Sequence, residues 1–204
     1  LRINTATGIS KIEKYKTKDF LLGGRTLSSR LVSREVEATC DALGRKNTLF
    51  FCTGALAGTA TSSANRLSIG GKSPLTGGIK ESNAGGIVAT RMAEQGLRCI
   101  ALEDAPAGDG AWKIVVIGKD GVQLLDGMFL AGKGVYEKSD LLSAQFGKNA
   151  GCITVGPAAE KLLLASGIAC SDPHGVCSRY AGRGGLGAVM ASKRVIAMVI
   201  LADG

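Results

Sequence analysis

Arginines close to clusters of glycine are the residues of this sequence best suited to chemistry. The glycines gather at positions 23–24, 70–71, 77–78 and 85–86 and, most densely, over 182–187. The arginines near them are Arg25, Arg66, Arg179 and Arg183. Glycine-rich loops expose backbone N–H groups that hold phosphate oxygens, and a guanidinium binds such oxygens through paired hydrogen bonds. These loops predict phosphate sites, although turns with solvated charges would have the same composition.

The elements that position these loops follow from the hydrophobic pattern. Alternating residues predict strands over 1–13, with a turn at Thr7-Gly8, and a hairpin over 112–117 and 123–126 with Asp120-Gly121 at its turn. Helical spacing predicts a helix that begins after Gly23-Gly24 within 20–43, and further helices over 87–95 and 135–146. Short apolar runs predict buried strands at 48–52, 99–102, 152–155 and 195–198.

The two halves of the chain resemble each other in this plan. Phe50-Phe51-Cys52-Thr53-Gly54 parallels Cys152-Ile153-Thr154-Val155-Gly156. Each run is followed by an arginine, Arg66 in one half and Arg179 in the other, and then by a double glycine, a short helix and a strand. This pattern predicts a single domain over 1–204 built by internal duplication, with halves of about 1–105 and 106–204. Two equivalent anion-binding corners would suit a ligand with two phosphate-bearing arms.

Composition and charge limit the class of protein. The 204 residues carry 25 Lys+Arg against 17 Asp+Glu, and 45% are hydrophobic, which is enough for a buried core. No run of about 18 apolar residues or signal-peptide pattern is present, so we expect a cytoplasmic protein without a membrane span. The sequence begins at Leu1 rather than Met, so this expectation concerns the chain as it stands.

The six cysteines indicate free thiols. They lie far apart, at 40, 52, 99, 152, 170 and 177, and none forms a C-x-x-C pair. Buried thiols in a reducing cytosol are the expected state. A metal role for Cys170 and Cys177 is the alternative.

The usual nucleotide motifs fit poorly. Residues 182–187 satisfy G-x-G-x-x-G, but the residues before them are polar and turn-forming, and the chain leaves no room for a further βαβ unit. No P-loop lysine is present. A net charge of +8 attracts nucleic acid, yet the 4% of aromatic residues gives little for bases to stack on. We therefore expect no nucleic-acid partner.

Two isolated residues leave alternatives open. His174, the sole histidine, is either a general base or a loop residue near the ligand. Lys72 either contacts phosphate or caps its turn. Two carboxylates, Asp172 and Glu81, could pair with the loop arginines and orient them.

A series of motifs along the whole chain resembles the N-terminal domain of aldehyde ferredoxin oxidoreductases. The most specific are K-S-P-L-T-G at 72–77 and G-R-G-G-L-G-A-V-M-A-S-K at 182–193. They are accompanied by Leu22-Gly23-Gly24-Arg25, Asn65-Arg66-Leu67-Ser68 and Asn83-Ala84-Gly85-Gly86. The resemblance implies an α+β fold of two pseudo-symmetry-related β-sheets with short helices. It also implies a tungsten (or molybdenum) bis-pyranopterin, whose phosphates are bridged by magnesium.

The resemblance assigns roles to individual residues. Arg66 and Arg179 match the two pterin-binding arginines, and Gly85 matches the glycine whose backbone meets the pterin. Asn83 and Tyr180 match the positions whose main-chain carbonyls hold the magnesium. Tyr180 departs from the family, where a small residue is commoner. The remaining matches form the second cofactor loop, at Gly182, Arg183 and Gly184.

The implied activity is the oxidation of aldehydes to carboxylates, with electron transfer through a [4Fe–4S] cluster to ferredoxin or another iron-sulfur carrier. The cluster and the acid/base residues belong to further domains or subunits, with which we expect this chain to assemble. A homo-oligomer is also compatible. The alternatives are a tungsten subunit of benzoyl-CoA reductase type and a non-catalytic cofactor carrier.

Overall fold

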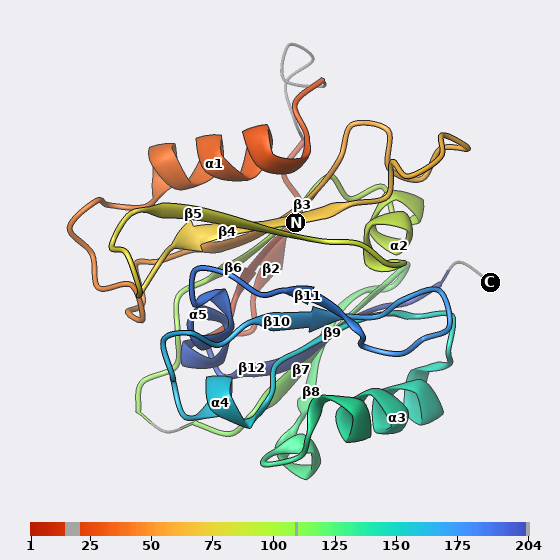
Figure 1. Ribbon diagram of the computed structural model, residues 1–204. Coiled ribbons are helices and arrows are strands. Elements are labelled where there is room, and N and C mark those ends of the chain that lie inside the picture. The colour runs from red at the N-terminus through yellow and green to blue at the C-terminus, as the bar shows by residue number, and fades with distance from the viewer. Residues whose placement is uncertain (15–20, 109, 203–204) are drawn as a thin grey trace.

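The chain folds into two six-stranded β-sheets packed face to face, as Figure 1 shows for the computed structural model, which describes residues 1–14, 21–108 and 110–202. The first sheet contains β1 (Arg2–Asn4), β2 (Ser10–Lys11), β3 (Leu49–Thr53), β4 (Leu67–Lys72), β5 (Ile79–Ala84) and β6 (Cys99–Glu103). The second contains β7 (Lys113–Gly118), β8 (Gly121–Asp126), β9 (Gly151–Thr154), β10 (Ile168–Cys170), β11 (Arg179–Ala181) and β12 (Val195–Ile200). The helices are α1 (Gly24–Glu35), α2 (Val88–Glu94), η2 (Met128–Leu130), α3 (Val135–Phe146), α4 (Pro157–Glu160) and α5 (Leu186–Ser192).

The two sheets have the same topology. The first has the order β2-β1-β6-β3-β4-β5, and the second, read in the same direction, has β8-β7-β12-β9-β10-β11. In each sheet one inner pair is parallel, β1 with β6 and β7 with β12, and the other pairs are antiparallel. The predicted α+β fold of two pseudo-symmetric sheets is therefore confirmed. The correspondence supports the predicted duplication of 1–105 and 106–204, which stays a prediction.

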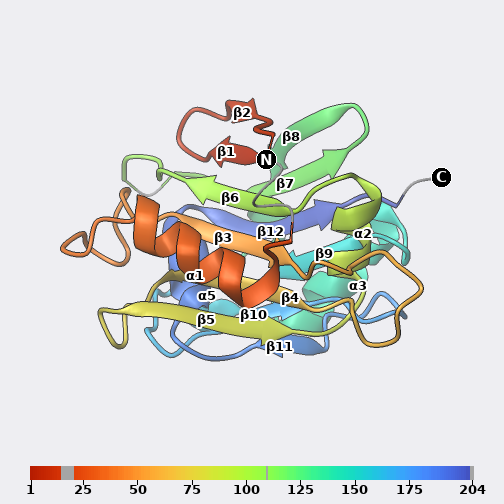
Figure 2. The same cartoon turned by 90° about the horizontal axis from the view of Figure 1, so that it is seen from above.

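Corresponding edges of the two sheets lie on the same side of the molecule when it is viewed from above. Figure 2 shows β5 and β11 along one side and the hairpins β1–β2 and β7–β8 along the other. At the hairpin side, a side chain at Gly8 would come 3.1 Å from Leu124. The short helices α2 and α5 fill opposite ends between the sheets, and each contacts strands of both (Figure 1). The sandwich is thus bordered on both sides by edge strands of the two halves.

The core lies between the sheets and is shared by both halves. Leu49, Phe51 and Ile69 from the first sheet pack in one cluster with Ile153 and Val199 from the second. Strands β3 and β12 are buried along their whole length because a helix or sheet covers each face, which explains their uninterrupted apolar sequences. A smaller cluster joins α1 to the outer face of the first sheet.

Most predicted elements agree with the structure. The hairpin of β7 and β8 turns at Asp120-Gly121, α3 has the predicted bounds, and α2 and α5 each follow a double glycine. The helix predicted within 20–43 starts at Gly24 but ends at Glu35, while Phe20 lies outside the described residues. The helix ends because Val36 takes an extended conformation, with φ of −103° and ψ of 118°. In the turn that follows, Lys72 Nζ donates to the carbonyls of Ala38 at 2.6 Å and Cys40 at 2.5 Å.

Four strands were not predicted from the sequence. These are β4, β5, β10 and β11, the two strands at one edge of each sheet. Strand β5 reads Ile-Lys-Glu-Ser-Asn-Ala and is mostly half-buried, so its hydrophobic signal is weak. Strands β10 and β11 have three residues each, too few for an alternating pattern to be recognised.

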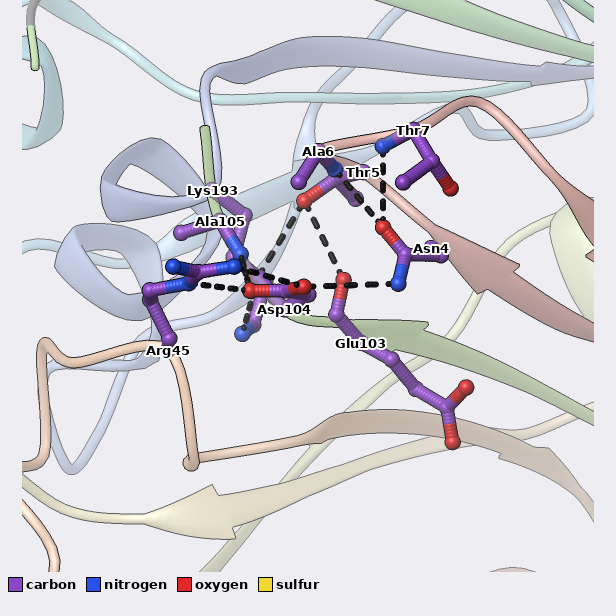
Figure 3. Close-up of polar contacts among 9 residues, drawn as sticks. All are labelled: Asn4, Thr5, Ala6, Thr7, Arg45, Glu103, Asp104, Ala105 and Lys193. Atoms are coloured by element: carbon purple, nitrogen blue, oxygen red, sulfur yellow. Dashed lines mark hydrogen bonds and ion pairs between the residues drawn. The ribbon is translucent and has the colours of Figure 1, made fainter. Parts of the chain in front are cut away.

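A polar junction joins the end of β6 to the end of α5, as the close-up in Figure 3 shows. Asp104 lies in the left-handed region, with φ of +60°, and its carboxylate accepts hydrogen bonds from Arg45 at 2.6 and 3.1 Å. On the other side, the buried Lys193 Nζ donates to the Asp104 carbonyl at 2.9 Å. At this junction Asp104 thus contacts both Arg45 of the first half and Lys193 of the second. The described part of the chain contains no helix long and apolar enough to cross a bilayer.

Candidate functional site

An open pocket of about 500 Å³ lies where the end of β5 meets the start of β11. We call it the arginine pocket. The first half contributes residues around the β5–α2 turn, and the second contributes the loop after β10 and the start of β11. Its lining residues are Arg66, Asn83, Ala84, Gly85, Gly86, Pro173, Ser178, Arg179 and Tyr180. Five of the eight sequence-predicted site residues, Arg66, Asn83, Gly85, Arg179 and Tyr180, are therefore together in one place.

A close backbone contact between the halves lies next to the residues that line this pocket. The Ile87 amide donates to the Ser171 carbonyl at 3.0 Å. Gly86 has a φ of +108°, and a Cβ at this position would lie 2.1 Å from the same carbonyl oxygen. Only glycine combines this conformation with this approach. Gly86 is thus required by packing, and the arginine pocket exists only where the two halves meet.

Arg66 presents its guanidinium beside bare backbone. Its Nε donates to Asn83 Oδ1 at 2.5 Å, and a Cβ at Gly85 would lie 3.6 Å from its Nη1. The absence of a side chain at Gly85 leaves space next to a fixed positive charge. An anion placed there would be in contact with both the guanidinium and the glycine backbone.

The second half adds another cation and a phenol. Arg179 and Tyr180 are both exposed at the edge strand β11. Burial raises the pKa of Tyr180 above its usual value, and the neighbouring Tyr136 adds to this effect, so the phenol stays protonated at neutral pH. The lining residues thus include two arginines and no carboxylate, which makes this part of the described surface attractive to anions.

The Asp172 carboxylate holds together the loop that forms one wall of the pocket. Its carboxylate accepts hydrogen bonds from Ser178 Oγ at 2.9 Å and from the His174 and Val176 amides. Burial opposes ionisation, but these three hydrogen bonds together lower the pKa of Asp172 below its usual value. Asp172 therefore holds the loop before β11 instead of pairing with a loop arginine.

The second glycine loop lies outside the arginine pocket. The Arg183 amide donates to Ser82 Oγ at 3.3 Å, and Ser73 Oγ donates to the Gly184 carbonyl at 2.7 Å. A Cβ at Gly184 would lie 2.2 Å from Lys80 Cγ. Gly182 and the Arg183 side chain are exposed. The backbone of this loop thus contacts the first half, just as Gly86, which follows the end of β5, contacts the second half.

One predicted equivalence is wrong. Arg66 and Arg179 were matched as counterparts in the two halves, but Arg66 precedes β4 whereas Arg179 starts β11, the counterpart of β5. They meet because β5 and β11 lie side by side, a relation that no linear comparison of the halves contains. The residues that do correspond are Ser73 and Ser171, each one position beyond its strand and each in contact with the opposite half.

The remaining candidates do not form a site. All six cysteines are free and buried, as predicted, and the described residues contain no group of three or more His, Cys, Asp or Glu that could hold a metal. Lys72 caps the turn after α1 rather than facing the pocket. His174 is exposed in its loop. The 182–187 motif does follow a short strand, contrary to expectation, but β11 is an edge strand paired only with β10, unlike the central parallel strand of a dinucleotide fold.

Comparisons with known proteins agree with this architecture. The family described as "Aldehyde ferredoxin oxidoreductase, N-terminal domain" matches residues 1–202, and the chain belongs to this family. Tungsten-containing aldehyde ferredoxin oxidoreductases from Thermococcus kodakarensis and Pyrococcus furiosus are 34% and 33% identical to it, over 98% of this chain and 32% of each relative. The chain thus spans about a third of the length of these relatives.

A solved structure has the same fold. The BamBC active-site complex of benzoyl coenzyme A reductase, solved with 1,5-dienoyl-CoA, matches with a TM-score of 0.90 at 24% identity. The match covers 98% of this chain and 30% of that one. As with the two enzymes from archaeal species, the common part is one domain of a larger polypeptide.

Proposed function

We propose that the arginine pocket binds a phosphate of a tungsten or molybdenum bis-pyranopterin, and that this chain is the cofactor-binding domain of an aldehyde:ferredoxin oxidoreductase. One observation carries the proposal: Arg66 and Arg179, from opposite halves, line one open pocket beside the bare backbone of Gly85, with no carboxylate in the lining. Family membership agrees with it.

The residues would act as follows. Arg66 and Arg179 bind phosphate oxygens, and the Gly85 backbone lets the pterin approach. Asn83 and Tyr180 offer main-chain carbonyls to a magnesium ion, a role that their places in the same pocket support. Gly182 and Arg183, which are exposed, would contact the second arm of the cofactor, and the buried Gly184 would complete their loop.

The bound cofactor would supply two-electron oxidation of an aldehyde to a carboxylate. This chain would bind and orient it, whereas a [4Fe–4S] cluster outside the chain would pass electrons to ferredoxin. The remaining two-thirds of the enzyme would complete the substrate pocket. The six reduced cysteines support a cytoplasmic location.

A related function is the second candidate. A tungsten subunit of benzoyl-CoA reductase type would use the same domain, and the likeness in fold to the BamBC complex supports it. A C-x-x-C-x-x-x-C motif in the sequence that follows this chain would favour either enzyme over a non-catalytic carrier. Activity assays with aldehydes and with aromatic acyl-CoA would then separate the two enzymes.

Metal and pterin analysis of the natively purified full-length protein tests the proposal. We expect tungsten or molybdenum together with about two pterins per metal. Arg66→Ala and Arg179→Ala should each lower the retained pterin while the thermal midpoint changes little, because both side chains are exposed. Native protein without tungsten, molybdenum or pterin would refute the proposal.

A further inference from the structure

A row of polar side chains crosses the outer face of β4 and β5 and ends at the arginine pocket. In the antiparallel register Ser68 lies opposite Asn83, and Glu81 lies two positions away on the same strand. Side chains two apart on a strand share a face, so Glu81 and Asn83 point to the same side as Ser68 and Arg66. The α1 residue Arg25 stands at the other end of the row.

Hydrogen bonds connect this row without interruption. Arg66 Nε donates to Asn83 Oδ1 at 2.5 Å, and Asn83 Nδ2 donates to Ser68 Oγ at 3.3 Å. Ser68 Oγ in turn donates to Glu81 Oε1 at 2.7 Å. The other carboxylate oxygen, Glu81 Oε2, lies 3.3 Å from Arg25 Nε.

The donor and acceptor groups fix the direction of each hydrogen bond in the row. A guanidinium can only donate, so the Asn83 carbonyl oxygen must face Arg66 and its amide nitrogen must face Ser68. The Ser68 hydroxyl then accepts from Asn83 and can satisfy Glu81 with its own proton. Ser68 is 1% exposed and the Glu81 side chain is 12% exposed, so a broken link would leave a buried polar group without its partner.

We propose that the side chains of Asn83, Ser68 and Glu81 position the Arg66 guanidinium for phosphate. The Asn83 side chain accepts the hydrogen bond from Arg66 Nε, and the terminal Nη groups of Arg66 remain available on the side of Gly85. A guanidinium held in one orientation binds an anion with less loss of side-chain entropy than a free one. This role belongs to the Asn83 side chain and is separate from that of its main-chain carbonyl. The inference rests on the proposed function.

The test uses the full-length protein, depleted of cofactor, and pyrophosphate as the probe in isothermal titration calorimetry. Arg66→Ala should weaken pyrophosphate binding by about 50-fold, as expected for loss of a charge-assisted pair. Asn83→Ala keeps the main-chain carbonyl and Arg66 itself, and should weaken binding about tenfold. In the holoenzyme, the pterin retained after dialysis at moderate salt should fall in the same order.

A double-mutant cycle separates positioning from a general structural effect. Because Asn83 acts through Arg66, Asn83→Ala should have no further effect on pyrophosphate affinity in the Arg66→Ala background. An equal loss in both backgrounds, or no loss from Asn83→Ala alone, would overturn the inference.

Two further sets of variants test the roles of Glu81 and Ser68. Glu81→Gln keeps an acceptor for Ser68 and should retain near-normal affinity, whereas Glu81→Ala should resemble Asn83→Ala. Ser68→Ala is compared with Ser192→Ala, a matched hydroxyl deletion in α5, where the Ser192 hydroxyl donates to Val189 within the helix and should not affect affinity. Equal losses of pyrophosphate affinity in Ser68→Ala and Ser192→Ala would contradict the positioning role of Ser68.

The same data separate this inference from the proposed function. If Arg66→Ala leaves both pyrophosphate affinity and pterin content unchanged, the pocket does not bind phosphate, and the proposed function and the inference both fail. If Arg66→Ala weakens binding but Asn83→Ala does not, the phosphate site stands and only the positioning role is refuted.

Discussion

Lys193 is a residue beyond the pocket whose ionisation the fold disturbs. Burial lowers its pKa to about 8, against the attraction of Asp104, and its ammonium donates to one carbonyl at the polar junction of Figure 3. The unfolded chain has the ordinary lysine pKa of 10.5. Between these two values the unfolded state binds more protons than the folded state, so stability rises with pH in that window.

We therefore expect Lys193 to add up to roughly 3 kcal/mol to the free energy of unfolding between about pH 8 and pH 10.5. Burial raises the pKa values of the Cys152, Cys170 and Cys177 thiols, so these groups act in the opposite direction above about pH 9. Lys193→Met, which removes the ionisable amine, should lose the Lys193 contribution. Urea unfolding at several pH values measures the slope. Lys161→Met, at an exposed position, serves as control and should keep the wild-type slope. An unchanged slope in Lys193→Met would show that Lys193 stays charged.

At the residue level, sequence reasoning found the cations and glycines of the pocket and one supporting carboxylate, Glu81, but not Ser68. Arg66 and Arg179 stand out because arginine near glycine is a recognisable combination. Glu81 does pair with another of these arginines, Arg25, as predicted. The alternation of Glu81 with Asn83 would have placed both on one face once β5 was recognised as a strand, and the pairing of β4 with β5 adds Ser68 to that face.

At the level of elements, the turns between β5 and α2 and between β11 and α5 connect the halves. Each contains glycines at positive φ, and each contacts the residue that follows β4 or β10 in the other half. The sequence interpretation attributed these glycines to ligand binding. Packing accounts for Gly86 and Gly184 directly, which the sequence could not indicate because the opposing residues, Ser171 and Lys80, lie about 85 and 104 positions away in the chain.

Gly86→Ala is the sharpest test of this packing role. The new Cβ would lie 2.1 Å from the Ser171 carbonyl oxygen in a strained backbone conformation, so we expect a loss of about 4 kcal/mol or more. Gly77→Ala is the matched control: its φ is +71°, but nothing lies within 4 Å of the added Cβ. That variant should lose only about 1 to 2 kcal/mol. Similar losses in chemical unfolding of the two variants would contradict the packing role of Gly86.

At the level of the whole molecule, the two sheets share one core and neither half encloses its own. The inner faces of both sheets belong to a single apolar cluster, and α2 and α5 each contact the sheet of the opposite half. The repeated strand order could be anticipated from the repeated strand-glycine-helix pattern. The face-to-face stacking of the sheets could not be anticipated from the sequence. The alternation of apolar residues along a strand shows that one face is buried, but not which element covers it.

Separate expression of 1–105 and 106–204 tests this dependence. Each fragment alone would expose the apolar face of a six-stranded sheet, so we expect neither to fold, and we expect the two together to form a native-like complex. Circular dichroism and co-purification of a tagged fragment measure the result. A cooperative thermal transition from either fragment alone would show that the halves are independent.

The meeting of β5 with β11 also has a consequence for synthesis on the ribosome. About 95 residues separate the end of β5 from the start of β11, which corresponds to roughly 5 to 20 s of translation. During that interval the nascent first sheet has an uncovered edge and an uncovered apolar face, the features that lead to aggregation. A chaperone that holds nascent chains should therefore associate with this polypeptide after β5 has left the exit tunnel and dissociate once β12 has emerged.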